Sequence, residues 1–277
     1  MLSNITTDDK LITMWLHGRP HTSVKAYRKA IYEFFDFVPK SLRECKLEDL
    51  QDYDNYLIEK NLSPASVRLK INALKSFFTF ATQLNYIPFN IAAAIKPPKG
   101  KYSLAGRILS KEDCQKIINC SELSLRDSLI VKFFYYTGVR VSELCRLRWS
   151  DFSQQLNGAV QVRIIGKGEK ERIIIVPAKL WSAMQELRGE NVFVFHSVRG
   201  KQLDCGFVTK LIKKIAIKAI NKNNISAHWL RHAHAQHTLA AGAPIHLVRD
   251  SLGHSNISIT NIYLESNPED CSSNYLD

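Results

Sequence analysis

Apolar residues recur at helical spacing through the first hundred residues. In residues 22–38 they fall on one face, and they are Val24, Tyr27, Ile31, Phe34, Phe35 and Val38. A second helix is predicted over residues 47–60. A third is predicted to begin with Ser63 as N-cap and Pro64 at its first helical position, because the first turn leaves its N–H groups unpaired and proline has none. The pattern indicates a helical N-terminal part.

The segment of residues 96–101, Lys-Pro-Pro-Lys-Gly-Lys, interrupts this pattern. Two prolines and a glycine oppose both helix and strand. We expect a linker over residues 97–107, between a helical domain of residues 1–96 and a second domain of residues 108–277.

The second part of the chain mixes helical and alternating patterns. Ser110 is a candidate N-cap, and a very apolar helix over residues 125–137 is predicted to end at Gly138. Two β-rich runs at 160–165 and 172–176 flank a polar glycine-containing turn and predict a hairpin. Further helices are predicted at residues 178–188, 205–221, 227–241 and 255–264. The expected fold is therefore mainly α with a small β-hairpin or sheet, in two domains.

Composition and charge point to a folded protein with an anionic partner. The chain has 277 residues, 45% of them hydrophobic, and a net charge of +12. Residues 101–263 carry +12, while the last fourteen residues carry −4. An excess of this size favours a polyanion, and nucleic acid becomes the leading candidate partner.

No signal peptide or membrane span is expected, because the start lacks basic and apolar regions and the apolar run 129–136 contains Lys132. The six cysteines are scattered without a C-x-x-C pair. They indicate reduced thiols in a cytoplasmic protein, and disagree with a zinc site or a disulfide framework.

Arg140 is the first candidate for site chemistry. It lies between the predicted end of one helix at Gly138 and the start of the next, where unpaired N–H groups favour anions. Its guanidinium could grip a phosphate through two hydrogen bonds. An ordinary contact with Glu143, three residues on, is the alternative.

His228 and Arg231 share one face of a predicted first helical turn after Ser226, and could address one anionic group. His228 and His232 also have the spacing of a zinc motif, but the glutamate of that motif is absent and no third ligand is evident. For His234, a packed or solvated histidine without a role is the default interpretation.

Lys167 and Tyr263 have ordinary and chemical interpretations. The hairpin turn presents Lys167 on a short projection, either to deliver a proton into a neighbouring groove or only to aid solubility. The turn does not match a nucleotide-binding loop. His254 precedes a predicted short helix that carries Tyr263, whose phenol either reaches a phosphate shared with His254 or packs.

Five motifs in this order resemble the tyrosine recombinase, or phage integrase, family, in its Xer-like form. They are Thr137-Gly138-Val139-Arg140-Val141-Ser142-Glu143-Leu144, Gly166-Lys167-Gly168-x-Lys170-x-Arg172, His228-x-Leu230-Arg231-His232, Leu252-Gly253-His254 and Ile262-Tyr263. The resemblance covers nearly the whole chain. It implies a SAM-like, core-binding N-terminal domain and a C-terminal catalytic domain.

The resemblance also implies a role for each matched residue. Tyr263 is the expected nucleophile, Arg140 and Arg231 hold the non-bridging oxygens, and His254 adds a hydrogen bond to the phosphate. Lys167 is the expected general acid, His228 a proton acceptor or phosphate ligand, and Glu143 the carboxylate that orients the site. Two guanidinium groups and an imidazole would stabilise the charge on the phosphorus, so neither a metal ion nor another cofactor is expected.

The implied partners are double-stranded DNA, other copies of the chain in a tetramer on DNA, and accessory recombination proteins. Further DNA contacts are expected from a basic helix face and from the third N-terminal helix, although a solvated face is an equal alternative: Lys210, Lys213, Lys214, Arg68 and Lys75.

Two departures from the family pattern are visible. Ala233 and His234 stand where a hydroxyl residue and an aromatic residue are expected, so the packing behind the site is expected to differ. Fourteen residues follow Tyr263, so the long C-terminal helix that relatives lend to a neighbouring subunit is expected to be short or missing.

The predicted function is site-specific DNA recombination by transesterification, through a 3′-phosphotyrosyl intermediate. Two alternatives remain open. A type IB topoisomerase-like enzyme would use the same tyrosine chemistry to relax DNA, and a catalytically silent regulator would bind DNA on the same scaffold.

Overall fold

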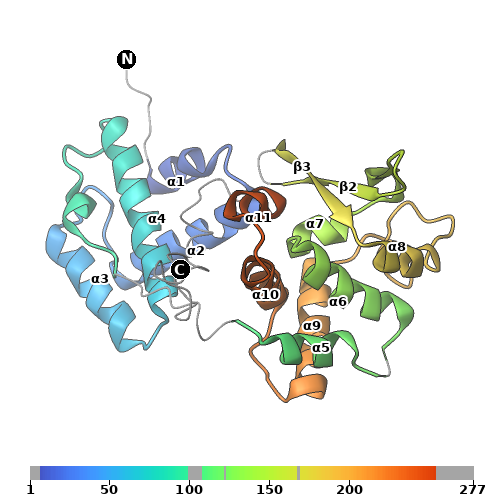
Figure 1. Ribbon diagram of the computed structural model, residues 1–277. Coiled ribbons are helices and arrows are strands. Elements are labelled where there is room, and N and C mark those ends of the chain that lie inside the picture. Colours follow the sequence, from blue (N-terminus) through green and yellow to red (C-terminus); the bar gives the residue numbers. More distant parts are fainter. Residues whose placement is uncertain (1–6, 99–107, 122, 167–168, 254–277) are drawn as a thin grey trace, which may run out of the picture. The chain divides into compact units, whose positions relative to one another are not determined.

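The chain divides into two compact units, Met1–Tyr102 and Ser103–Asp277 (Figure 1). The computed structural model describes residues 7–98, 108–121, 123–166 and 169–253. The helix expected at residues 255–264 lies outside these ranges, and the division into residues 1–96, 97–107 and 108–277 stays a prediction.

The described part of the first unit is helical. Its elements are α1 (Asp8–Leu16), α2 (His21–Phe37), α3 (Leu47–Glu59), α4 (Pro64–Gln83) and the 3-10 helix η1 (Ile91–Ala94). The three predicted helices are confirmed as α2, α3 and α4, whereas α1 was not predicted. As expected, Ser63 caps α4, with its hydroxyl accepting a hydrogen bond from the backbone N–H of Ser66 at 3.2 Å.

Aromatic side chains form the centre of this unit. Phe34 of α2 is fully buried, and its ring centroid lies 5.3 Å from that of Tyr53 and 6.3 Å from that of Phe78. The apolar positions at helical spacing in α2, α3 and α4 therefore meet in one core.

The second unit combines helices with a small sheet. Its elements are α5 (Lys111–Ile118), α6 (Leu125–Thr137), α7 (Val141–Arg146), the 3-10 helix η3 (Trp149–Asp151), β1 (Phe152–Gln154), β2 (Val160–Ile165), β3 (Glu171–Val176), α8 (Ala178–Gln185), α9 (Cys205–Ile220), α10 (Ala227–Ala240) and α11 (Ile245–Leu252). In Figure 1 the sheet lies at one end of this unit, while α5 and α9 lie together at the other. The mainly helical fold with a small sheet is confirmed.

Helix α6 is the central element of this unit. It is apolar on several faces, and it packs against α5, α8, α10 and β3. It ends where predicted, because Gly138 adopts the left-handed conformation with φ 61° and its N–H bonds to the carbonyl of Phe134. The chain then turns directly into α7.

The predicted hairpin is confirmed as β2 and β3, which pair antiparallel with Val162 opposite Ile174. Residues alternate between buried and exposed along β2 and the second half of β3, as expected for a sheet with one covered face. The short strand β1, which pairs with β2, was not predicted.

Helix α11 completes the arrangement around the sheet. It packs against α10 and β3, and its Val248 and Leu252 are buried beside Ala235 of α10. It was not predicted, because the pattern after Pro244 is only eight residues long. The ends of α6, α7, α10 and α11 are thereby brought to one region.

Gly138→Ala is expected to destabilise the second unit. An added Cβ would stand 2.7 Å from both His234 Cδ2 and Leu252 Cδ2, in a residue held at φ 61°. The left-handed conformation costs about 1–2 kcal/mol and overpacking a further ~1–3 kcal/mol. Urea unfolding should show both losses in the free energy of unfolding. Gly158→Ala is the control, since φ is 79° there with open space around the added Cβ, and should show only the first loss. Equal losses in the two variants would contradict the packing argument.

Candidate active site

The buried carboxylate of Glu143 joins α7 to β3. Its side chain is only 2% exposed. Oε2 accepts hydrogen bonds from the backbone N–H of Arg140 and from Arg172 Nη2, both at 2.7 Å. Oε1 accepts from Arg140 Nη1 and Arg172 Nη1, both at 2.9 Å. The contact between Arg140 and Glu143 considered from the sequence is therefore present, as part of a three-residue cluster.

The charge state of Glu143 follows from these contacts. Burial alone would raise the pKa of this carboxyl group. The hydrogen bonds from Arg172 and from the Arg140 backbone outweigh that effect and lower the pKa to about 2. Glu143 is therefore ionised at neutral pH, and it neutralises one of the two guanidinium charges beside it.

Arg231 is the buried cation of α10, with an exposed fraction of 4%. Its Nη1 donates to the carbonyl of Gly138 at the end of α6, and its Nη2 donates to the carbonyl of Leu252 at the end of α11 at 2.7 Å. One guanidinium thus ties three helices together at the point where α7 begins.

His228 lies one turn before Arg231 on α10, with its side chain exposed. Partial loss of hydration to the surrounding protein, followed by the positive charges of Arg231 and Arg140, lowers the pKa of its imidazole. The predicted residues Arg140, Glu143, His228 and Arg231 are therefore neighbours in space, although two of them come from α10 and two from the start of α7.

The other three predicted site residues, Lys167, His254 and Tyr263, lie outside the described residues. The described residues that precede two of them belong to the same cluster. A Cβ added to Gly166 would stand 3.6 Å from Glu143 Oε1, and one added to Gly253 would stand 3.2 Å from the Arg172 side chain.

Arg172 is the residue that sequence reasoning missed. It is the last residue of the motif that begins at Gly166, and the resemblance assigns it no role. In the structure it makes a two-point contact with Glu143, and its Nε donates to the carbonyl of Ser251 at 2.7 Å. Its place at the end of that motif was the only signal in the sequence.

His234, also on α10, is packed inside the unit. Its Nδ1 lies 2.8 Å from the carbonyl oxygen of Tyr135, and burial lowers its pKa to about 4. The rings of His228 and His232 have centroids 6.4 Å apart. In the described ranges, no three His, Cys, Asp or Glu side chains gather to hold a metal ion.

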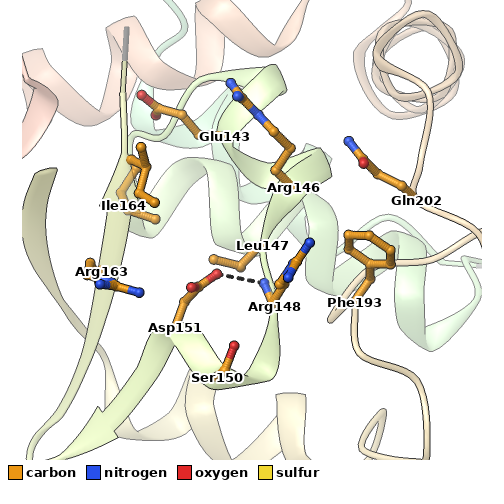
Figure 2. Close-up of a pocket in the computed structure, with 11 residues that line it drawn as sticks. Glu143, Arg146, Leu147, Arg148, Ser150, Asp151, Arg163, Ile164, Phe193 and Gln202 are labelled. Carbon is orange, nitrogen blue, oxygen red and sulfur yellow. Dashed lines mark hydrogen bonds between the residues drawn. The ribbon is translucent and has the colours of Figure 1, made fainter. Parts of the chain in front are cut away.

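A pocket of about 370 Å³ adjoins Glu143 between α7, η3 and β2 (Figure 2). Arg146, Arg148 and Arg163 line it together with Asp151, which accepts a hydrogen bond from the backbone N–H of Arg148 at 2.8 Å. Its lining is positively charged, with three guanidinium groups against two carboxylates.

The residues predicted to make further DNA contacts are spread over both units. Lys210, Lys213 and Lys214 are exposed on α9. In the first unit, Arg68 donates to the carbonyl of Pro98 at 2.8 Å and 3.2 Å. Lys75 Nζ donates to three carbonyls at the end of η1, at 2.6–3.0 Å. Arg68 and Lys75 therefore have structural contacts, and all five DNA contacts stay predictions.

Comparison with known proteins gives matches over both parts of the chain. Residues 107–270 match the model of the phage integrase family, and residues 11–86 match that of the phage integrase N-terminal SAM-like domain. The chain is 31% identical over 266 residues to the tyrosine recombinase XerD of Listeria innocua serovar 6a, covering 89% of this chain and 88% of that protein.

Several solved structures share the fold, among them two complexes with DNA. The XerH site-specific recombinase bound to a palindromic difH substrate in a post-cleavage complex gives a TM-score of 0.75 at 22% identity, covering 97% of this chain and 89% of that chain. A lambda integrase tetramer bound to a Holliday junction gives 0.77 at 18% identity, covering 98% and 81%. Among the helices in the described ranges, none is both long and apolar enough to cross a membrane.

Glu143→Gln is expected to remove a part of the pH dependence of stability. The folded pKa of Glu143, about 2, lies below its ordinary value of 4.5, so its ion pairs stabilise the fold above pH 4.5 and lose that effect as the pH falls towards 2. In urea unfolding, the wild type should lose about 3 kcal/mol more than the variant between pH 5 and pH 2.

At neutral pH the same variant should unfold with a free energy lower by about 3–5 kcal/mol, because two guanidinium groups lose their buried partner. The control is Glu112→Gln on α5, whose carboxylate is 79% exposed and which should behave like the wild type. Parallel pH curves for the wild type and Glu143→Gln would contradict the assignment.

Proposed function

Because the chain belongs to the phage integrase family of tyrosine recombinases, which cut and rejoin DNA, we propose that Tyr263 is its nucleophile and that Arg140 and Arg231 hold the phosphate under attack. The observation that carries this proposal is the convergence of Arg140, His228 and Arg231 from α7 and α10. Together with Arg172 and Glu143, the cluster holds three guanidinium groups and one carboxylate, of which Arg140 and Arg172 contact Glu143 directly. The remaining positive charge suits a phosphodiester.

The reaction is a transesterification in which atoms and charge balance. The Tyr263 oxygen attacks the phosphorus, a bond forms between them, and the bond from phosphorus to the 5′ oxygen breaks. The 5′ oxygen takes a proton from Lys167, and His228 accepts the phenolic proton. The ester bond is retained as a 3′-phosphotyrosine, so that the 5′ hydroxyl of another strand can reverse the step.

The electrostatics of the described residues support these roles. A phosphodiester repels nucleophiles, and charge builds on its non-bridging oxygens as the phosphorus becomes pentacoordinate. Protein partners hold the guanidinium groups of Arg140 and Arg231 in the site before a phosphate binds. The lowered pKa of His228 keeps its imidazole neutral at neutral pH, which is the form that accepts a proton.

The relatives and structures that the chain matches are recombinases and integrases. They support recombination and give no support to a topoisomerase-like or a catalytically silent protein. The proposed partner is duplex DNA, and the proposed working assembly is a tetramer of this chain on DNA, as in the lambda integrase structure. We also propose that the protein acts in the cytoplasm and that accessory recombination proteins are among its partners.

Tyr263→Phe should bind DNA with near-normal affinity but form no covalent adduct, because only the attacking oxygen is removed. The measurement uses a library of nicked duplexes, from which the short 5′ fragment escapes after cleavage, and detects the trapped adduct in a denaturing gel. Sequencing the trapped ends identifies the target. Tyr136→Phe, an exposed tyrosine on α6, is the control and should form the adduct. An adduct formed by Tyr263→Phe would overturn the assignment.

Arg140→Ala should cut the same substrate about 100- to 1,000-fold more slowly, by analogy with the loss of one preorganised donor to a developing oxyanion. Arg231 also holds α6 and α11 together, so Arg231→Lys, which keeps the charge, tests that position. Single-turnover cleavage rates measure both effects, with the exposed Arg199→Ala as control. Wild-type rates in both site variants would exclude this phosphate clamp.

A further inference from the structure

Three arginines from three elements bind three successive carbonyl groups at the end of α11. Arg172 of β3 donates to Ser251 at 2.7 Å, Arg231 of α10 to Leu252 at 2.7 Å, and Arg140 before α7 to Gly253 at 3.0 Å. The last carbonyls of a helix have no partners within it, and they carry the negative end of its dipole. The end of α11 is therefore fixed by cations.

Arg172 differs from the other two arginines in how its nitrogen atoms are used. Nη1 and Nη2 both donate to Glu143, Nε donates to Ser251, and the side chain is only 9% exposed. The Arg140 side chain is more exposed than that of Arg172, at 32%, and it donates hydrogen bonds to Glu143 and to the carbonyl of Gly253. Arg172 thus faces the protein with all three of its nitrogens.

A phosphate that binds in the site competes with these protein acceptors for the Arg140 guanidinium. Glu143 and the Gly253 carbonyl are the protein acceptors that hold this guanidinium, and the phosphate must draw it from them in part. Arg172 supplies Glu143 with a second cation and anchors α11 at Ser251. Glu143 then remains ion-paired and α11 remains packed in place when the Arg140 guanidinium forms hydrogen bonds with the phosphate.

We propose that Arg172 is a positioning residue for DNA cleavage, which holds Glu143 and the end of α11 so that Arg140 and the Gly253 carbonyl stay in position when the phosphate binds. This inference rests on the proposed function. Arginine suits the task because its planar fork makes a two-point contact with a carboxylate and leaves Nε for a carbonyl, whereas lysine has one nitrogen.

The first test compares cleavage with binding. Arg172→Gln should bind the nicked duplex within about threefold of the wild type, since backbone contacts elsewhere dominate affinity. It should cleave about 100-fold more slowly in a single turnover, the cost of a small misplacement of reacting groups. Arg172→Lys should recover part of the rate. The control is Arg199→Gln, an exposed arginine outside the cluster, and its rate should be that of the wild type.

The second test is the pH profile, which a purely structural role would leave unchanged. The charged groups that face Glu143 are Arg140 at the start of α7 and Arg172 on β3, with Arg146, Arg148, Asp151 and Arg163 around the adjoining pocket. Without the Arg172 charge and its two hydrogen bonds, only the Arg140 contacts oppose the effect of burial. The pKa of Glu143 therefore rises above its wild-type value of about 2, and the carboxylate takes up a proton at a higher pH. The ratio of the Arg172→Gln rate to the wild-type rate should therefore fall as the pH is lowered from 8 to 5.5. His228 titrates in both proteins, so its effect on the two rates cancels in the ratio.

The outcomes are distinguishable. A wild type that forms no adduct would refute the proposed function itself. A wild type that forms the adduct, with Arg172→Gln and Arg172→Lys cleaving at its rate, would overturn the inference alone. A slow Arg172→Gln variant with a flat pH ratio and a melting temperature lowered in proportion would also overturn it. If Arg172→Gln does not fold, the same measurements on Arg172→Lys test the inference. Normal DNA binding with slow cleavage by this variant supports the inference, and cleavage at the wild-type rate refutes it.

Discussion

A carboxylate buried to 2% exposure must be paired, and Glu143 meets this requirement with two guanidinium groups that reach it from opposite directions in the sequence. The apolar core of the second unit holds its helices against the sheet, but hydrophobic burial is non-directional. The ion pairs of Glu143 have a defined geometry, and they fix how these elements are oriented against one another. They fix Arg140 at the start of α7 to Arg172 on β3, and Arg172 extends the constraint to Ser251 at the end of α11. Without this cluster, burial alone would hold α7, β3 and α11 together, and their ends at the site would not be fixed relative to one another.

The same network explains how a site for an anion is maintained in the protein alone. Arginines that await a phosphate would repel one another if they were unpaired. Here Arg231 and Arg140 rest on the carbonyls of Leu252 and Gly253, where a helix ends and partial negative charge accumulates. A helix terminus stabilises the cations less than a full negative charge would. The site is therefore organised in advance, and a phosphate with its whole charges can replace the weaker contacts.

Local signals in the sequence predicted most of the helices, while the contacts of the site required three dimensions. Ser63 before Pro64 and Gly138 after an apolar run mark helix ends through chemistry that acts within a few residues, and both predictions are confirmed. Strand β1 has three residues and is defined by its pairing with β2, so no local pattern reveals it. Motif resemblance selected Arg140, Glu143, His228 and Arg231. It gave no role to Arg172, because which arginine reaches Glu143 depends on where the hairpin lies against α7.

His234 shows how the protein packs a residue that departs from the family pattern. An aromatic residue is expected there, and the imidazole is a flat ring with a pKa lowered to about 4, so that it is uncharged at neutral pH. Because a carbonyl oxygen only accepts, the Nδ1 atom that lies 2.8 Å from the Tyr135 carbonyl must carry the proton. That carbonyl is one of the last of α6, and the preceding turn of α10 already provides Arg231 for the carbonyl of Gly138. The histidine therefore adds a hydrogen bond to the end of α6 that a purely hydrocarbon ring could not provide.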